Sequence, residues 1–114
     1  MKHETKDGVL VISLEGNLLG EHTNAPVMEL IKQSIEGGNK KVLFNLSEMK
    51  FINSTGLGML LTAVSKTRNA GGELALCALP DQMKKLLQMT KLEGVFHSKP
   101  DEASAITFLK GASA

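Results

Sequence analysis

The chain has 114 residues, of which 42% are hydrophobic and 22% are charged, and its formal net charge is +1. This length suits one ordinary domain, and this composition is typical of a globular protein and not of a disordered or membrane-spanning chain. The near balance of basic and acidic residues, together with the lack of Trp and Tyr, disfavours nucleic-acid binding. We therefore predict one domain over residues 1–114, with no nucleic-acid partner and no membrane insertion.

The N-terminal part predicts two buried strands with a helix between them. Residues 8–16, GVLVISLEG, are rich in aliphatic residues between turn formers and predict a central strand, to which residues 2–5 add an antiparallel edge strand through the turn KDG. Thr23 or Asn24 caps the predicted helix. One face of this helix is apolar, with Val27, Leu30, Ile31 and Ile35. Residues 40–46, KKVLFNL, predict the second buried strand.

A helix is predicted over residues 57–69, before the stop signal of two glycines. Its apolar stripe consists of Leu57, Leu60, Leu61 and Val64. Met59 and Ala63 lie off this stripe, so the first turns are apolar on more than one side. Either these residues fill gaps in the core or Met59 belongs to an interface with a partner.

The C-terminal part predicts two further strands and two helices. Residues 73–79, ELALCAL, predict a core strand, and residues 94–98 predict a short one. Pro80 opens a helix with Met83, Leu86 and Leu87 on its inner side. Ser98 and Asp101 have the spacing of a capping box at the start of the last helix. The inner side of this helix is predicted to carry Ala103, Ile106 and Leu109.

This alternation of strands and helices predicts an α/β fold with right-handed crossovers. We expect a mostly parallel, mixed sheet of about four or five strands flanked by about four helices. The single cysteine, Cys77, lies in an apolar stretch and is predicted to be a buried structural residue, which fits a reducing compartment. The polar start of the chain lacks the apolar segment of a signal peptide, so we expect a cytoplasmic protein.

Residues 51–61, FINSTGLGMLL, place hydroxyls and glycines where a strand gives way to a helix. Binding sites of open α/β sheets gather at such crossings, and the amino end of a helix favours an anion. Ser54 is therefore well placed to hold a negative group. The simpler interpretation is that Ser54, or Thr55, only caps the helix, and that Gly56 and Gly58 serve a tight turn and close packing.

The sequence gives little support for catalysis. The pattern G-x-G at Gly56 and Gly58 lacks the third glycine of a dinucleotide-binding loop, and no phosphate-binding loop of the Walker type is present. No serine lies in a nucleophile elbow, and the three histidines lack metal-ligand spacing: His3, His22 and His97. We expect neither an enzyme nor a cofactor or metal, and a small nucleotide-binding protein is the least favoured alternative.

Two short motifs carry a resemblance to a known family. Asn45-Leu46-Ser47 follows an apolar strand, and residues 51–58, FINSTGLG, follow soon after. Together they resemble the signature of STAS domains, specifically of anti-sigma factor antagonists of the SpoIIAA/RsbV type. The resemblance extends over nearly the whole chain, including LEGNL near the start and MKKLLQMTKLEGVF near the end.

The resemblance implies a protein-binding module that is switched by phosphorylation. In this family an ATP-dependent anti-sigma factor serine kinase phosphorylates the serine that corresponds to Ser54, and a PP2C-type phosphatase removes the phosphate. The unphosphorylated antagonist binds the kinase and so frees a sigma factor for transcription. The expected partner-binding residues are Asn53, Ser54, Thr55, Gly56, Leu57, Gly58 and Met59.

The chain departs from the family pattern at two positions. Asn53 stands where the family most often has Asp, and Leu19 stands where many relatives have Asp. These departures favour an alternative in which the chain is a non-switching STAS scaffold or a subunit associated with a lipid or anion transporter. In that case Ser54 only caps its helix.

Overall fold

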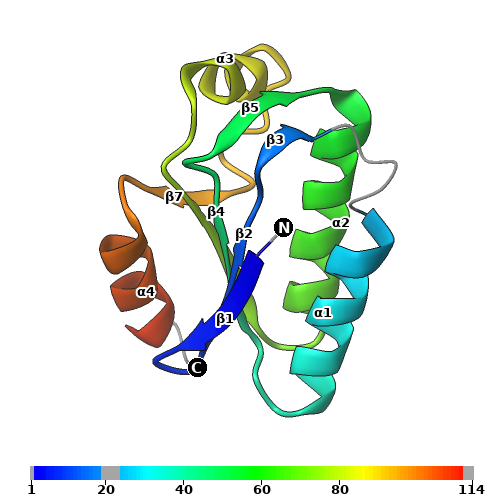
Figure 1. Ribbon diagram of the computed structural model, residues 1–114, viewed down its shortest axis with the longest axis vertical. Helices are drawn as coiled ribbons and strands as arrows, with labels where there is room; N and C mark the ends of the chain where they lie inside the picture. Colours follow the sequence, from blue (N-terminus) through cyan, green and yellow to red (C-terminus); the bar gives the residue numbers. More distant parts are fainter. Residues whose placement is uncertain (1, 19–23, 112–114) are drawn as a thin grey trace.

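Strands and helices alternate along most of the chain in the computed structural model, which describes residues 2–18 and 24–111 (Figure 1). In chain order the elements are β1 (Lys2–Lys6), β2 (Val9–Ser13), β3 (Gly16–Leu18), α1 (Asn24–Glu36), β4 (Lys41–Asn45), β5 (Met49–Ile52), α2 (Ser54–Asn69), β6 (Glu73–Cys77), α3 (Asp81–Met89), β7 (His97–Lys99) and α4 (Glu102–Gly111).

A five-stranded sheet with the order β1-β2-β4-β6-β7 forms the centre of the molecule. β1 is antiparallel to β2, and the other neighbouring pairs are parallel. Helices α1 and α2 cover one face of this sheet, α4 covers the other, and α3 lies at one end beside β5 (Figure 1). The predicted α/β class, with a mostly parallel mixed sheet and four helices, is confirmed.

The two faces of the sheet explain why its strands are continuously apolar. In β2, Leu10 and Ile12 pack into the larger core beneath α1 and α2, whereas Val9 and Val11 pack into a smaller core beneath α4. Alternate side chains of a strand point to opposite faces, so a strand covered on both faces has no position for a polar residue. Cys77 lies in the smaller core, fully buried, as predicted.

The predicted hairpin at the start of the chain is confirmed. Asp7 and Gly8 join β1 to β2, and both have positive φ angles, of 52° and 77°. Two successive residues with positive φ are typical of the tight turns that match the twist of paired strands. Aspartate and glycine tolerate this conformation, which is why the sequence KDG marks the turn.

Several predicted boundaries and caps differ from the structure. Helix α2 begins at Ser54 and not at residue 57, and the short strand β7 begins at His97 and not at residue 94. Asp101 caps α4, because its Oδ1 accepts the N–H of Ser104 at 2.8 Å, so the predicted capping box with Ser98 is wrong. Ala103 is exposed, and Ala105 takes the predicted inner position. The predicted cap Thr23 lies outside the described residues.

Strand β3 was not expected from the sequence, and the strand expected just before Ser54 was not recognised as a separate element, β5. They pair in parallel as a separate two-stranded sheet, with Leu18 opposite Ile52. Both strands are short, and neither shows regular alternation of buried and exposed residues. Their pairing therefore depends on a contact between distant segments and leaves no local pattern. β5 leads directly into α2, so this small sheet sets the position of the helix start.

The apolar surplus on α2 belongs to the core. Met59 is 2% exposed and Ala63 is fully buried. Helix α2 packs against both the sheet and α1, so it buries two sides and needs apolar residues beyond a single stripe. This excludes the side chain of Met59 from an exposed interface.

Gly56 allows the first turn of α2 to lie against β3. A Cβ atom at this position would lie 2.2 Å from the carbonyl oxygen of Leu18, which is far inside van der Waals contact. By contrast, a Cβ atom at Gly58 would meet nothing within 4 Å. The two glycines of the motif therefore differ in purpose: only Gly56 is required by packing.

We predict that Gly56→Ala destabilises the protein, because the added methyl group collides with backbone that is fixed by β3–β5 pairing. The expected loss in the free energy of unfolding is about 1–3 kcal/mol. Gly58→Ala is the matched control: it should stabilise by roughly 0.5–1 kcal/mol, since alanine favours a helix interior. Urea denaturation followed by circular dichroism measures both. Equal effects of the two substitutions would contradict the assignment.

An ion pair joins the N-terminal hairpin to α4. The Nζ of Lys6 lies 2.8 Å from Oε2 of Glu102, and Oε1 of Glu102 accepts a hydrogen bond from the side-chain Nδ2 of Asn45 at 3.3 Å. These hydrogen bonds, first the one from Lys6, hold the pKa of Glu102 below its ordinary value of 4.5. A carboxylate with a lowered pKa stabilises the fold above its unfolded pKa, and this stabilisation is lost as the pH falls through the folded pKa.

Glu102→Gln keeps an acceptor for Asn45 and removes only the charge. We expect the variant to be slightly less stable than the wild type at pH 7, because the ion pair with Lys6 is partly exposed and screened. The difference should shrink as the pH falls below 4.5 and disappear once the pH lies below the lowered pKa of Glu102, where the wild-type carboxylate is protonated. Thermal unfolding at a series of pH values measures this. A difference that is independent of pH would rule out the ion pair as its cause.

Candidate functional site

Asn53 caps helix α2 at the point where the FINSTGLG motif leaves β5. Its side-chain Oδ1 accepts the N–H of Gly56 at 2.8 Å, and its backbone oxygen accepts the N–H of Leu57 at 2.9 Å. Its backbone is extended, with φ −108° and ψ −177°, as is usual for a cap residue. The suggestion that Ser54 or Thr55 is the cap is therefore wrong, because Asn53 occupies that position.

Ser54 is the first residue of α2 and is exposed, as is Thr55. The first N–H groups of a helix have no partner within the helix and make its amino end electropositive. The first turn of α2 contains no acidic residue. The hydroxyl of Ser54 is thus accessible, in a field that favours negative charge, and it is not needed as the cap.

The structure divides the seven predicted partner-binding residues into two groups. Ser54 and Thr55 are exposed, and Asn53 and Gly58 are partly exposed. The other three are buried and face the core, namely Gly56, Leu57 and Met59. These three residues are not available to a partner, and their contribution is to hold α2 against the rest of the molecule. The sequence alone does not separate these groups, because both lie within one turn and a half of helix.

Phe51 is a surface residue that the sequence analysis did not select. It lies in β5, three residues before Ser54, and its side chain is 44% exposed, although large apolar residues are usually buried. The part of α2 that follows, from Ser54 to Ser65, contains no charged residue. The exposed phenylalanine and the uncharged start of α2 are adjacent in the chain, and both are compatible with a surface that a partner covers.

The backbone just before Ser54 is held from two sides. On one side, the N–H of Asn53 donates to the carbonyl of Leu18 in β3, at 3.3 Å. On the other side, the side chain of Gln82 in α3 forms two hydrogen bonds with the backbone of Ile52. Ser54 therefore starts its helix from a fixed position. The second family departure, Leu19, lies outside the described residues.

The remaining candidates for chemistry do not assemble into a site. His3 is exposed, and Nε2 of His97 lies 3.6 Å from Glu73, while His22 is outside the described residues. Burial raises the pKa of the Cys77 thiol to about 11, so it is not a nucleophile at neutral pH. Among residues 2–18 and 24–111, no cluster of three or more His, Cys, Asp or Glu could hold a metal ion.

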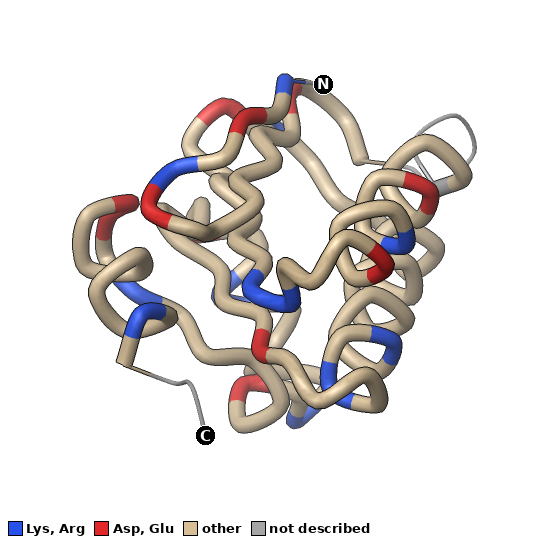
Figure 2. The backbone as a smooth tube through the Cα atoms, turned by 90° about the horizontal axis from the view of Figure 1, so that it is seen from below, with Lys and Arg blue, Asp and Glu red and all other residues tan. Residues whose placement is uncertain are grey.

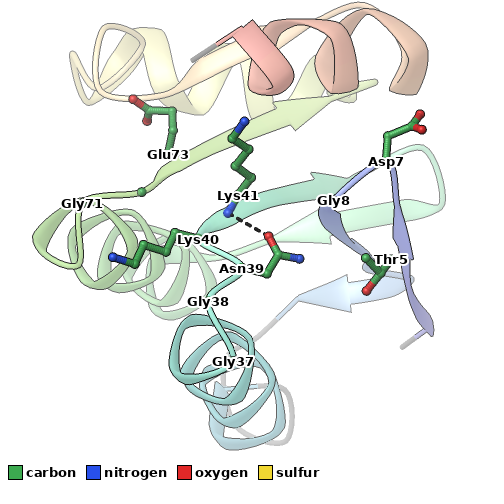
Figure 3. Close-up of a pocket in the computed structure, with 11 residues that line it drawn as sticks. Thr5, Asp7, Gly8, Gly37, Gly38, Asn39, Lys40, Lys41, Gly71 and Glu73 are labelled. Atoms are coloured by element: carbon green, nitrogen blue, oxygen red, sulfur yellow. Dashed lines mark hydrogen bonds between the residues drawn. The ribbon is translucent and has the colours of Figure 1, made fainter. Parts of the chain in front are cut away.

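A cavity of about 640 Å³ lies at the end of the sheet where β4 and β6 begin (Figure 3). Ser54 follows β5 and is not among the residues that line this cavity. Lys40 and Lys41 contribute positive charge to the lining, and Asp7 and Glu73 contribute negative charge. Backbone N–H groups in the lining donate to acceptors of the fold: Gly37, Gly38, Asn39, Lys41, Gly71, Gly72 and Glu73. These amides are not free to bind an anion, so the cavity is a gap between turns.

The distribution of charged residues and the apolar character of the helices match the nearly neutral composition of the chain. Basic and acidic residues are interspersed along the described chain (Figure 2). In the part of the chain that the structure describes, no helix has both the length and the apolar character needed to span a bilayer.

Comparison with known proteins gives curated relatives named as anti-sigma factor antagonists, and the solved structures of similar fold also include a sulfate transporter family protein from Wolinella succinogenes, with a TM-score of 0.70 at 14% identity and coverage of 94% and 88%. The chain is 29% identical over 107 residues to the anti-sigma F factor antagonist of Paenibacillus polymyxa, covering 93% of this chain and 91% of that one. A putative anti-sigma factor antagonist from Thermotoga maritima shares the fold, with a TM-score of 0.82, 19% identity and coverage of 96% and 93%.

A third relative, SpoIIAA, has the same fold in two solved forms. The unphosphorylated form has a TM-score of 0.75 at 21% identity, covering 96% of this chain and 97% of that chain. The phosphorylated form, from Bacillus, has a TM-score of 0.72 at 23% identity, covering 94% and 96%. The model of the STAS domain matches residues 1–105 of the present sequence, which is most of its length. The chain therefore belongs to the STAS domain family.

Proposed function

We propose that this chain, as a single STAS domain, is an anti-sigma factor antagonist that is switched by phosphorylation of Ser54. In the unphosphorylated state it binds an ATP-dependent anti-sigma factor serine kinase and thereby frees a sigma factor. The observation that carries this proposal is the exposed position of Ser54 as the first residue of α2, with Asn53 as the cap. The family relatives named as anti-sigma factor antagonists support the same conclusion.

The local structure accommodates a phosphate at Ser54 without unfolding. A phosphoserine carries a charge of about −1.5 to −2 at neutral pH, and such a charge is favoured at a helix amino end. The cap bond runs from Gly56 to Asn53 and does not involve the Ser54 hydroxyl. Esterification of that hydroxyl therefore leaves the cap in place and changes only the surface.

The same phosphate is unfavourable in a protein interface. The exposed residues of α2 from Ser54 to Ser65 carry no charge, and Phe51, three residues before Ser54 in the chain, is exposed as well. A partner that covers this surface would exclude water from it, and burying an unpaired dianion there is costly. The modification thus opposes docking while the fold stays intact, which is what a switch between partners requires.

The remaining roles follow from this proposal. A PP2C-type phosphatase restores the free hydroxyl, and the exposure of Ser54 makes it accessible to both enzymes. The chain itself acts by binding and performs no catalysis. Its place of action is the cytoplasm, where the kinase, ATP and the sigma factor are found.

We predict that Ser54→Asp abolishes binding of the kinase, whereas Ser54→Ala retains it. The introduced carboxylate places a charge in the interface, and alanine only removes the hydroxyl. The Ser54→Ala protein is used as bait in cell extract, the captured kinase is identified by mass spectrometry and purified, and affinities are measured by calorimetry. Thr107→Asp, exposed on α4, is the control for added charge and should bind like the wild type.

Phosphate transfer is tested with the purified kinase and ATP. Stoichiometric phosphorylation of the wild type, and none of Ser54→Ala, is the expected result. Equal binding by Ser54→Asp and Ser54→Ala, together with no phosphate at Ser54, would reject the switch. The chain would then be a STAS scaffold that binds without regulation at this serine.

The amide of Asn53 gives a second prediction about the phosphorylated state. Because Oδ1 is occupied by the cap bond, the other end of this side chain is the donor group Nδ2. Asn53→Asp preserves the cap, since both residues are good caps, but replaces this donor with a negatively charged oxygen. We expect unchanged thermal stability and a raised second pKa of phosphoserine 54, because a neighbouring like charge disfavours the dianion.

The measurement is a ³¹P NMR titration of protein with phosphoserine incorporated at position 54 during synthesis. Asn53→Ala is the reference for loss of the cap and should cost about 1 kcal/mol of stability. If Asn53→Asp and the wild type titrate at the same pH, the side chain of residue 53 does not act on the phosphate.

A further inference from the structure

The side chain of Gln82 joins α3 to β5 through both ends of its amide group. Its Oε1 accepts the N–H of Ile52 at 3.2 Å, and its Nε2 donates to the carbonyl oxygen of Ile52 at 3.1 Å. Gln82 is partly buried at this position. One side chain thus bonds both the N–H and the carbonyl oxygen of Ile52, which fixes this part of β5 relative to α3.

The amide group of Gln82 occupies the place beside β5 where a third strand of the small sheet would form its hydrogen bonds. β5 pairs with β3 along one edge, and Asn53 extends that pairing by donating to Leu18. The backbone groups of Ile52 point to the opposite edge, where the fold supplies no further strand in β3–β5. A glutamine amide has the same donor and acceptor as a peptide group, so it pairs with Ile52 as a neighbouring strand would.

This pairing lies two residues before Ser54. Ile52 is held by Gln82, Asn53 is held by Leu18, and the next residue along the chain is Ser54. Helix α3 is also held to the core by the buried side chains of Met83 and Leu87. Through Gln82, the position of α3 therefore constrains the backbone that presents the serine hydroxyl.

We propose that Gln82 is a positioning residue that fixes the start of α2, and so couples α3 to the phosphorylation site. The biological role of this coupling rests on the proposed function, but the coupling itself is tested without a partner protein. Loss of Gln82 leaves the N–H and the carbonyl oxygen of Ile52 without the side chain that pairs with both, and the segment from β5 into α2 opens more often. The phosphate then spends less time against the first N–H groups of α2.

The first test is amide hydrogen exchange by NMR on the whole chain. Gln82→Ala should lower the protection of the Ile52 amide by roughly 5- to 30-fold, since a typical net hydrogen bond is worth about 1 kcal/mol and two are lost. The matched control is Gln88→Ala, which removes an exposed glutamine from the same helix and should leave this amide unchanged. Exchange is measured well below the unfolding temperature of each variant.

The Gln82→Glu variant should lose protection of the Ile52 amide at neutral pH and regain it at low pH. A general loss of stability would not produce this pH dependence. Its ionised carboxylate accepts from Ile52 but cannot donate to the carbonyl, so protection should fall at neutral pH. Protonation of the introduced carboxyl restores a donor. The protection factor of Ile52, corrected for intrinsic exchange, should therefore recover as the pH falls through the pKa of that carboxyl.

The second test reads the effect at residue 54. In protein with phosphoserine incorporated there, Gln82→Ala should raise the second phosphate pKa in a ³¹P titration, and Gln88→Ala should not. Unchanged Ile52 protection, or an unchanged phosphate titration with lowered protection, would overturn the proposal. Both results are independent of any kinase, so they stand apart from the failure of the proposed function, which shows as absent binding and phosphorylation.

Discussion

The carbonyl group of Leu18 fixes where helix α2 begins, and the rest of the candidate site depends on that position. It accepts the N–H of Asn53, and it lies so close to Gly56 that no side chain fits between them. The first turn of α2 therefore lies directly against β3 in the two-stranded sheet. Every residue of the motif then takes its orientation from this contact: Gly56 faces β3, Leu57 faces the core, and Ser54 faces solvent.

Capping and modification are assigned to neighbouring residues, and this separation is what makes a switch feasible. If the serine itself were the cap, a phosphate on its oxygen would change the hydrogen bonding that holds the first turn. With Asn53 as the cap, the helix is stabilised independently of the state of Ser54. The modification therefore alters the charge of a surface and leaves the core untouched, so its effect is confined to which proteins dock there.

The role of Asn53 as the cap of α2 shows what its departure from the family pattern changes and what it leaves unchanged. Asn53 differs from the usual aspartate by a donor in place of an acceptor, yet its capping oxygen is preserved. The substitution is thus neutral for the fold and informative only for the charge next to Ser54. Gln82, far away in the sequence, supports the same segment from α3, and no local pattern connects it with the motif.

The sequence by itself determined the α/β class, the buried strands β2, β4 and β6, the tight turn at Asp7 and Gly8, and the motif around Ser54. These features depend on apolar runs and turn residues, which are local properties. Only the tertiary structure decided which member of the Asn53–Ser54–Thr55 run is the cap, that Met59 belongs to the core, and that β3 pairs with β5. These outcomes depend on contacts between segments that are distant in the chain, such as Leu18 with Gly56 and Gln82 with Ile52. Such contacts form only when the whole fold is in place, so no short stretch of sequence encodes them.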